Sequence, residues 1–441
     1  MNTNKFKIII LVFSICFWYS CDIEDGQDLN GPQTSSISEG LSRPELPQVV
    51  SGILADMRDR LHTQIDAISV LGRDYWRHQS SDPRWVGDLM TGTLDDNAFY
   101  LTTPYSARYA VVKECNLLLE GLENTTETFT DAEKAAIRGF ANTIKAHELL
   151  SVLMMLYQNG IRTDVADPDN LGAFESFDGA LTTIIGLLNT AATDLTTGGG
   201  NVSPNTLGLE TMPISYLEFN RAITARAAAY QGDYTLVLTA LADSFMDINA
   251  PMSLGAYYKF SSAGGDALNQ LFFALNSTGA NARIAHPDFV NSAEAGDTRV
   301  NKAVFREVED EDTMVLEPNP LNIADLTPGT HDVWVYQSST DPVGMIRNEE
   351  LLLLYAEANM VSNPSEAEAA IDAVRDAAGL GPIGAGNVDE DQLLYERRYS
   401  LFAEGHRWID MRRFDRLDEL VIDRAGDNIV TQFPIPQNEG Q

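Results

Sequence analysis

The densest concentration of residues that could do chemistry lies at 395–413, where five arginines and three carboxylates stand among bulky apolar side chains. Clustered guanidinium and carboxylate groups can form a catalytic or anion-binding site, or they can pair with one another. No second motif nearby supports a catalytic or anion-binding role. We therefore expect a structural ion-pair network, in which the arginine heads pair with Glu396, Glu404 and Asp410. One buried helical stripe would carry the arginine stems, and its apolar members would be Leu394, Tyr399, Phe402 and Trp408.

Several motifs that could indicate an enzyme lack the context that their chemistry requires. The segment 379–384 matches G-x-G-x-x-G by letter, but it follows a helical pattern, and Pro382 removes an amide that a phosphate would need. His147 lacks the second histidine of a zinc-protease helix, and the six histidines show no metal-ligand spacing. The two aspartates at 95–96 have no partner carboxylate for glycoside hydrolysis. We therefore predict no enzymatic activity, no metal site and no cofactor.

The chemistry that remains is that of aromatic side chains in polar, irregular segments. A pyranose ring has an apolar C–H face that stacks on an indole or phenol ring, while flanking Asp, Asn and Arg side chains bond its hydroxyl groups. Such residues occur at 75–85 and again in the second irregular region. A loop tryptophan can also be a packing anchor. The predicted ligand-binding residues are Trp76, Trp85, Tyr257, Tyr258 and Trp334.

The charge of the chain restricts its partners. Sixty-four Asp and Glu against 30 Lys and Arg give a formal net charge of −34. Such a field repels phosphate backbones and anionic lipid surfaces, so nucleic-acid binding is not expected. A highly soluble extracellular surface would have this composition, and a preference for cationic ligands is the alternative. Hydrophobic residues make up 44% of the chain, which is enough for a packed core.

The N-terminus predicts export. Two lysines precede the apolar run Ile8–Tyr19, which would cover roughly 18 Å as a helix, well short of a ~30 Å hydrocarbon core. Residues 1–20 therefore read as a signal peptide and not as a transmembrane helix. Cys21 follows a small residue, as in a bacterial lipoprotein cleavage site, and a plain secretory signal is the alternative. Residues 21–47 would then be a lipidated, flexible tether. Cys115 would have no disulfide partner, and we expect it to be buried on a helix.

The elements that must position these residues are predicted to be mainly helical. Thr130 and Glu133 have the cap chemistry of a helix start. Residues 248–344 are rich in Gly, Asn, Ser and Asp, which predicts long loops with a few short strands. The apolar spacing predicts helices at 49–71, 106–122, 130–157, 174–195, 215–230, 233–246, 346–361, 365–378 and 389–416. Paired helices with short turns are compatible with TPR-like units at 131–195, 215–246, 346–378 and 389–416.

Three motifs, in the expected order, resemble the SusD/RagB family, the glycan-capturing outer-membrane lipoproteins of Bacteroidetes. Residues 395–413 are similar to the C-terminal signature of that family. Residues 347–359 share its Arg-x-x-Glu, apolar run and Ala-Glu-Ala, and the third match is the ending Phe-Pro-Ile-Pro-Gln-Asn at 433–438. Weaker likenesses extend the resemblance from about residue 100 to the end of the chain.

The resemblance implies a mainly α, SusD-like fold, with four TPR-like helix pairs carrying an irregular ligand-binding half. One domain would cover 48–441, with a loop-rich insert at about 248–344 and the signature region at about 345–441. The acidic residues at 22–25 resemble the surface-export signal of Bacteroidetes lipoproteins. No site residue can be carried over, because family binding sites vary with the substrate.

The implied function is that of a non-enzymatic, surface-exposed lipoprotein. It would be anchored in the outer membrane by its N-terminal lipid, capture oligosaccharides and deliver them to a SusC-like TonB-dependent transporter. Three alternatives stay open: a peptide-capturing RagB-like uptake lipoprotein, a helical scaffold that binds only proteins, and a surface hydrolase.

Overall fold

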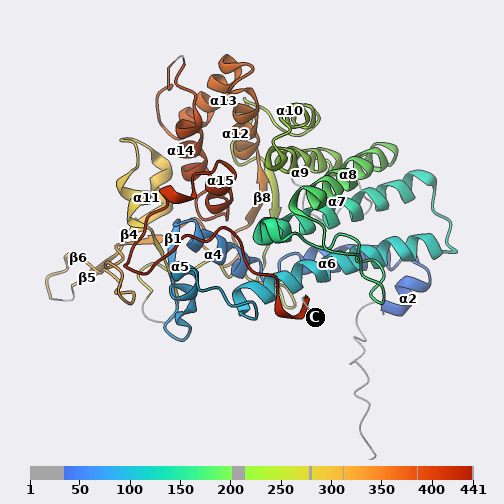
Figure 1. Ribbon diagram of the computed structural model, residues 1–441, viewed down its shortest axis with the longest axis horizontal. Coiled ribbons are helices and arrows are strands. Elements are labelled where there is room, and N and C mark those ends of the chain that lie inside the picture. The colour runs from blue at the N-terminus through green and yellow to red at the C-terminus, as the bar shows by residue number, and fades with distance from the viewer. Residues whose placement is uncertain (1–33, 201–213, 278–280, 311, 385, 440–441) are drawn as a thin grey trace, which may run out of the picture.

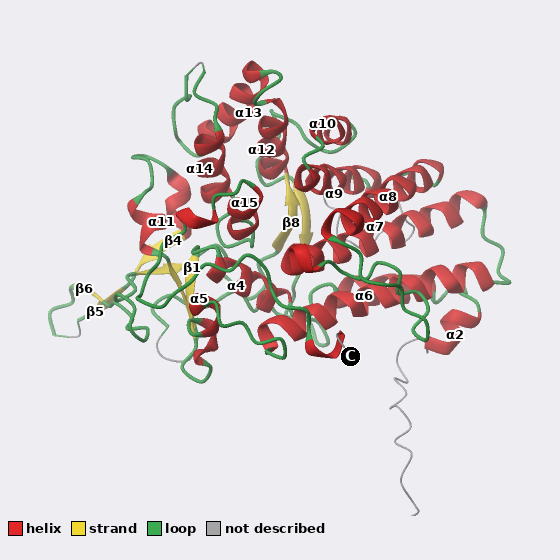
Figure 2. Ribbon diagram, viewed as in Figure 1, coloured by secondary structure: helices red, strands yellow, loops and turns green. Residues whose placement is uncertain are grey.

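The computed structural model describes residues 34–200, 214–277, 281–310, 312–384 and 386–439. The predicted signal peptide and Cys21 lie outside these ranges. The described chain is mainly helical, with short strands at one end of the molecule and with β8 among the long helices (Figures 1 and 2). The longer helices are α2 (Thr34–Glu39), α3 (Leu46–Asp56), α4 (Leu61–Leu71), α6 (Phe99–Asn124), α7 (Asp131–Leu156), α8 (Phe177–Thr197), α9 (Tyr216–Gln231), α10 (Tyr234–Ala242), α12 (Asn348–Asn359), α13 (Pro364–Ala377), α14 (Glu390–Ser400) and α15 (Arg407–Arg413).

Short helical segments and strands fill the connections. The short helices are η1 (Pro83–Trp85), α5 (Asp88–Thr91), η2 (Tyr157–Asn159), α11 (Pro287–Asn291), η4 (Thr298–Lys302), η5 (Leu417–Glu419) and η6 (Gln437–Glu439). The strands are β1 (Tyr75–His78), β2 (Gly255–Tyr258), β3 (Ala282–Ala285), β4 (Ala303–Phe305), β5 (Glu307–Glu309), β6 (Leu316–Pro318), β7 (His331–Val333) and β8 (Val343–Arg347). None of the described helices combines the length and the apolar character needed to cross a membrane.

Local capping fixes where the long helices begin. Thr130 and Glu133 form a complete capping box at the start of α7, as the sequence predicts, and Ser215 and Glu218 form a second one at α9. The helices then pack in the predicted pairs, α7 with α8, α9 with α10, α12 with α13 and α14 with α15. Figure 1 shows α6 to α10 on one side of the molecule and α12 to α15 on the other. The fold is mainly α, as predicted.

The predicted helix 49–71 is instead two helices, and the break forms part of the site described below. Arg60 adopts a left-handed conformation (φ 53°), which ends the helical path between α3 and α4. The buried Arg108 of α6 donates hydrogen bonds to the carbonyl oxygens of Met57 (2.8 Å) and Asp59. These carbonyls therefore bond to a side chain and not to the next helical turn. The break is therefore determined by a tertiary contact, which the hydrophobic periodicity of the sequence does not reveal.

Two other boundaries also differ from the sequence prediction. The range 389–416 is split into α14 and α15, because Ala403 and Gly405 take positive φ angles of 62° and 81° between them. At the other end, part of the segment expected to be a tether is ordered. Ile37 of α2 is buried, and Leu41 is buried with its amide bonded to the Gly121 carbonyl of α6 (2.8 Å). Apolar burial on α6 therefore orders the chain before residue 47.

The strands form three small antiparallel sheets. A four-stranded sheet has the order β1-β3-β7-β4, with Tyr75 opposite Ala285. The β2–β8 ribbon contains an irregularity between Ala256 and Tyr257, and β5 and β6 form a separate hairpin. A bulge re-aims the side chains that follow it, which matters because Tyr257 and Tyr258 come directly afterwards.

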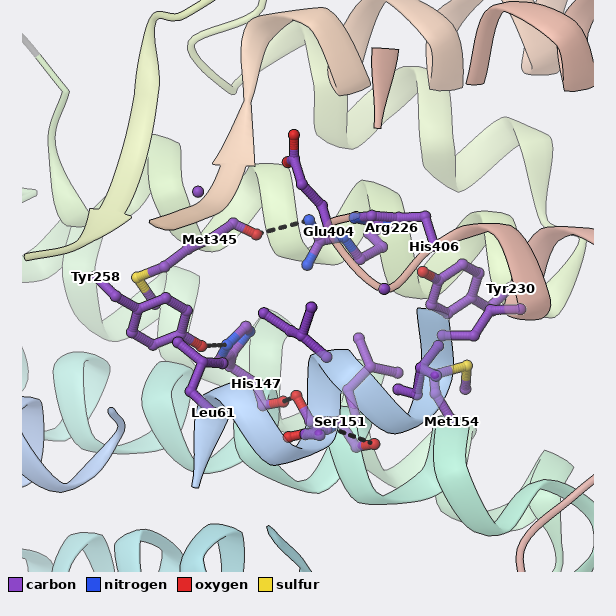
Figure 3. Close-up of a pocket in the computed structure, with 17 residues that line it drawn as sticks. Leu61, His147, Ser151, Met154, Arg226, Tyr230, Tyr258, Met345, Glu404 and His406 are labelled. Atoms are coloured by element: carbon purple, nitrogen blue, oxygen red, sulfur yellow. Dashed lines mark hydrogen bonds between the residues drawn. The ribbon is translucent and has the colours of Figure 1, made fainter. Parts of the chain in front are cut away.

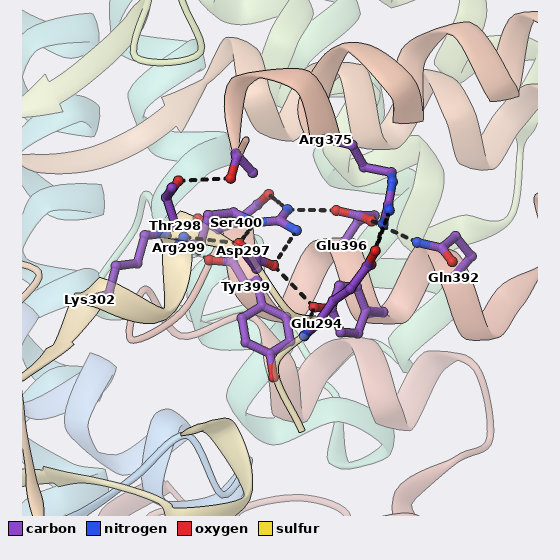
Figure 4. A network of polar contacts seen from close by, with 12 residues as sticks. Glu294, Asp297, Thr298, Arg299, Lys302, Arg375, Gln392, Glu396, Tyr399 and Ser400 are labelled. Carbon is purple, nitrogen blue, oxygen red and sulfur yellow. Dashed lines mark hydrogen bonds and ion pairs between the residues drawn. The ribbon is translucent and has the colours of Figure 1, made fainter. Parts of the chain in front are cut away.

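The C-terminal signature region is a buried ion-pair network, as predicted (Figure 4). The apolar stripe is buried, and Arg397 pairs with Asp410 (2.9 Å). The fully buried Glu396 takes partners from outside the segment, namely Arg299 at 2.6 Å and Arg375 at 2.8 Å. The network thereby ties α14 to η4 and α13. Glu404 likewise pairs with Arg347 from outside the segment, so of the three predicted carboxylates only Asp410 pairs with arginines of the segment itself. Because these ion pairs join separate elements, we assign the network a structural role.

Candidate ligand-binding site

Two of the five predicted ligand-binding aromatics are packing anchors. Trp76 is 1% exposed, lies edge-on to His286 at 5.4 Å, and donates its Nε1 hydrogen to Asp423. Trp85 is 3% exposed, lies edge-on to Phe99, and donates to Gln79 (3.0 Å). A ring without an exposed face cannot stack on a sugar. The structure therefore differs from the prediction at both tryptophans.

Of the two tyrosines on β2, Tyr257 lies at the surface and Tyr258 lies in the interior. Tyr258 is buried, and its hydroxyl lies 2.9 Å from Nε2 of His147. Tyr257 is half-buried, and its hydroxyl donates to the Ser253 carbonyl oxygen. Because the two side chains alternate in direction along the strand, only Tyr257 offers part of its ring outside. The structure thus keeps Tyr257 as a candidate contact and places Tyr258 beneath it.

Tyr257 lines a surface groove made of two adjoining hollows, which we call the α3–α4 groove. The hollow beside Tyr257 has a volume of about 190 Å³, and its neighbour, beside Phe260, has about 300 Å³. Arg58 and Ala55 line both hollows. The larger hollow reaches the lower end of the range for small-ligand sites, about 300–1,000 Å³, and the smaller one lies below it. The walls are the end of α3, the turn into α4 and the loop after β2.

Polar groups surround the rings of the groove. Arg58 donates to Asp266 (2.6 Å) and to the Lys259 carbonyl oxygen (2.6 Å), and its guanidinium lies 5.8 Å from the Phe260 ring centroid. Asp266 also accepts from Ser261 (2.6 Å), and this hydrogen bond is the main cause that lowers the pKa of Asp266. Carboxylate, guanidinium and carbonyl groups thus stand beside half-exposed aromatic faces. This combination suits a ligand with an apolar ring face and a hydroxyl rim.

The fifth predicted residue, Trp334, lies outside the groove. It is half-buried and tilted against Phe272, with 6.1 Å between the ring centroids. Neither hollow of the groove is lined by Trp334. Asn269 connects the loop after β2 to the Trp334 region, through hydrogen bonds to the carbonyl oxygens of Ser339 and Asp341 (both 2.8 Å). The structure therefore attaches Trp334 to the same loop without bringing it beside Tyr257.

A second pocket adjoins the groove (Figure 3). Tyr258 and Met345 line both spaces, and this pocket has a volume of about 100 Å³. Burial lowers the pKa of His147 to about 3, so its ring is neutral at physiological pH. Arg226 is held by Glu350 (2.6 Å) and by the Met345 carbonyl oxygen (2.7 Å). The pocket is smaller than either hollow of the groove, so the groove is the better candidate for a sugar.

The groove residues that sequence reasoning missed are Arg58, Phe260 and Asp266. Arg58 stood on the polar face of a helix expected to run unbroken from 49 to 71, where a charged side chain is ordinary. The sequence did carry one sign of the break, because acidic and basic residues are unusually dense at Asp56–Arg60, where four of the five residues are charged. Phe260 lies two residues after the tyrosine pair and could have been grouped with it. Within the described residues, no cluster of three or more His, Cys, Asp or Glu side chains could hold a metal ion.

One wall of the groove should respond to pH through Glu114 of α6. Burial, followed by a hydrogen bond with the Asp56 carboxyl, raises the pKa of Glu114 from 4.5 to about 8. The folded state therefore holds a proton that the unfolded chain has released, and stability falls as pH rises from about 4.5 to about 8. Asp56 also lines the groove.

We expect Glu114→Gln to stabilise the protein at about pH 9 by roughly 2 kcal/mol, discounted for partial exposure, and to change little at about pH 4. Urea denaturation of both proteins at the two pH values measures this difference. An equal effect of the substitution at both pH values would contradict the assignment.

The comparisons with known proteins agree with this architecture. Residues 324–439 match the family model described as the SusD family. A curated relative, SusD-like protein P38 from Formosa agariphila, is 27% identical over 143 residues. That match covers 30% of this chain and 26% of the relative, so the chain matches about a quarter of the relative's length.

Solved structures show the same fold over most of the chain. Surface glycan-binding protein A from Bacteroides thetaiotaomicron, in complex with laminarihexaose, has a TM-score of 0.70 and 15% identity, and the match covers 90% of this chain and 97% of that one. A laminarin binding SusD-like protein has a TM-score of 0.63 and 15% identity, with coverages of 93% and 98%. NanU from B. fragilis has a TM-score of 0.64 and 14% identity, with coverages of 92% and 94%.

The helix pairs, the small sheets and these likenesses give the chain a SusD-like fold. Its C-terminal region, which contains the signature and the buried ion-pair network, matches the SusD family model over residues 324–439.

Proposed function

We propose that this protein is a non-enzymatic glycan-binding lipoprotein that captures oligosaccharides in the α3–α4 groove. The observation that carries the proposal is the groove itself, where Tyr257 and Phe260 stand beside Arg58 and Asp266. Aromatic faces provide affinity for the C–H face of a pyranose, and the charged and carbonyl groups select its hydroxyl pattern. Two solved proteins of the same fold are described as binding laminarin or laminarihexaose.

The proposal extends to the location of the protein and its partner. A lipid on Cys21 would hold the protein at the outer membrane, facing the exterior, and a SusC-like TonB-dependent transporter would receive the captured oligosaccharide. The apolar run and the small residue before Cys21 support this anchoring. The strongly acidic composition suits an exposed, soluble surface.

Lipid attachment is expected to depend on one sulfur atom. Cells that express the protein should incorporate labelled palmitate into it, and Cys21→Ala should abolish that incorporation. Cys16→Ala is the matched control and should leave the label in place, because the residue before it is an isoleucine and not a small residue. Label that persists in Cys21→Ala, or disappears in Cys16→Ala, would contradict the assignment.

Calorimetric titration of the purified protein against a panel of oligosaccharides tests the binding function. Laminarihexaose is the first probe, followed by oligosaccharides of other sugars and linkages. The proposal expects saturable binding of at least one of them, with unchanged oligosaccharide recovered afterwards. Binding confined to oligopeptides, or release of shorter sugars, would contradict it.

A further inference from the structure

The β5–β6 hairpin stands away from the rest of the molecule, beyond β4 and β1 in Figure 1. We call residues 307–310 and 312–318 the β5–β6 arm. Its strands pair antiparallel, with Val308 opposite Glu317 and Glu309 opposite Leu316. Every residue of β6, and all but the first of β5, is exposed. Neither face of the hairpin is therefore covered, although an isolated two-stranded hairpin is only marginally stable in water.

Apolar side chains gather on this arm. Met314 is 70% exposed and Leu316 is 60% exposed, and Val308 and Val315 are more than half exposed. Phe305 at the base is exposed as well. In the register of the hairpin, Val308 and Leu316 lie on opposite faces, so both faces of the arm expose apolar side chains near its tip. Exposed apolar groups that gather in one segment mark an interaction site.

The fold holds these side chains outward. At the base of the arm, the buried Arg306 forms an ion pair with Asp332 and donates to the carbonyl oxygens of Asn319 and Ser277 (both 3.0 Å). Near the tip, Asp310 accepts hydrogen bonds from the backbone and the hydroxyl of Thr313 (2.8 and 2.9 Å). The base of the arm is thus fixed to the body, and the turn at its tip is held by its own hydrogen bonds.

The backbone at the tip is also held in a costly conformation. Met314 has a φ of 56°, in the left-handed region that a long side chain rarely adopts. Such a residue costs about 1–2 kcal/mol. An exposed methionine in a strained turn adds no folding stability, so its presentation favours a binding role.

The charges on the arm indicate the kind of partner. Acidic residues surround the apolar side chains, at Glu307, Glu309, Asp310, Asp312 and Glu317. A second copy of this chain would bring the same acidic arm and a formal charge of −34, so self-association is disfavoured. An anionic lipid surface would be repelled for the same reason.

We propose that the β5–β6 arm docks into an apolar pocket rimmed by lysine or arginine on a different protein. Met314, Val315 and Leu316 would fill the pocket, and the flanking carboxylates would pair with the basic rim. This surface is separate from the α3–α4 groove, and the inference does not depend on glycan binding.

Site-specific photo-crosslinking in the cells that produce the protein tests the proposal. A benzophenone amino acid is placed at Leu316, and the matched control position is Val361, which is 88% exposed but lies off the arm. The expected result is one crosslinked protein from position 316 and none from 361, with a lysine- or arginine-rich crosslinked peptide. Combining the probe with Glu309→Lys and Glu317→Lys should reduce the crosslink at least about fivefold, and added salt should weaken it.

Four outcomes would overturn the proposal. They are crosslinks to a second copy of this chain, crosslinks to lipid, equal yields at 316 and 361, and a yield that the charge reversals leave unchanged. Circular dichroism should show the same fold for the charge-reversed variant. The oligosaccharide titration should also be unaffected by it, which separates a failure of this inference from a failure of the proposed glycan binding.

Discussion

The double substitution Tyr257→Ala and Phe260→Ala should lower the affinity for the captured oligosaccharide at least about tenfold. Each ring offers a stacking face in the α3–α4 groove. Aromatic stacking contributes about 0.5–1.5 kcal/mol per ring beyond the area that it buries, and about 1.4 kcal/mol is a factor of ten in affinity. Titration calorimetry with the best ligand of the panel measures the change. The single substitutions should each give a smaller loss.

Two controls distinguish a binding contact from a packing contact. Phe305→Ala removes an exposed aromatic ring outside the groove and should change neither affinity nor fold. Trp85→Ala removes a buried ring and should lower the free energy of unfolding by about 3 kcal/mol while the folded protein still binds ligand. Unchanged isotherms for the Tyr257 and Phe260 double variant would exclude this groove as the site.

Glu396→Ala should destabilise the protein by about 3 kcal/mol. The carboxylate is fully buried and receives the guanidinium groups of Arg299 and Arg375, so its loss removes one ion pair from each. Breaking a buried pair by removing one partner costs about 3–5 kcal/mol, and this case lies at the lower end because Arg299 keeps Asp297 and Arg375 keeps Glu294. Urea denaturation, followed by tryptophan fluorescence, measures the loss.

A second carboxylate on the same helix provides the control for that experiment. Asp391 lies in the first turn of α14 and pairs with Arg416, but its side chain is 75% exposed. Asp391→Ala should therefore cost less than about 1 kcal/mol. Comparable losses for the two variants would contradict the structural role that we assign to the buried network.

Much of the helical frame follows from local patterns. The capping box at Thr130, the buried stripe that includes Tyr399 and Trp408, and the burial of Cys115 on α6 are all confirmed. These features depend on residues close together in sequence, where helical period and cap chemistry are informative. The ion-pair role of the C-terminal arginines is confirmed for Arg397 and Arg413 at Asp410, whereas Arg398 pairs with the distant Asp288, which spacing could not indicate.

The binding surface could not be predicted in the same way. The exposure of an aromatic residue depends on partners that are distant in sequence, such as Asp423 and His286 around Trp76. The neighbouring tyrosines of β2 differ in role only because strand alternation and a local irregularity turn one inward. Arg58 became a groove residue because Arg108 of another helix binds the carbonyl oxygens on either side of it, those of Met57 and Asp59. Contacts between residues so far apart in the chain cannot be predicted from composition or from residue spacing.

The most direct test of the central claim is a crystal structure of the protein with its tightest-binding oligosaccharide from the panel. The account predicts an intact sugar chain in the α3–α4 groove, with a pyranose face against Tyr257 or Phe260 and hydroxyl groups within hydrogen-bonding distance of Arg58 or Asp266. Electron density for the ligand elsewhere, for example against Trp334 and Phe272, or for a cleaved sugar, would contradict it.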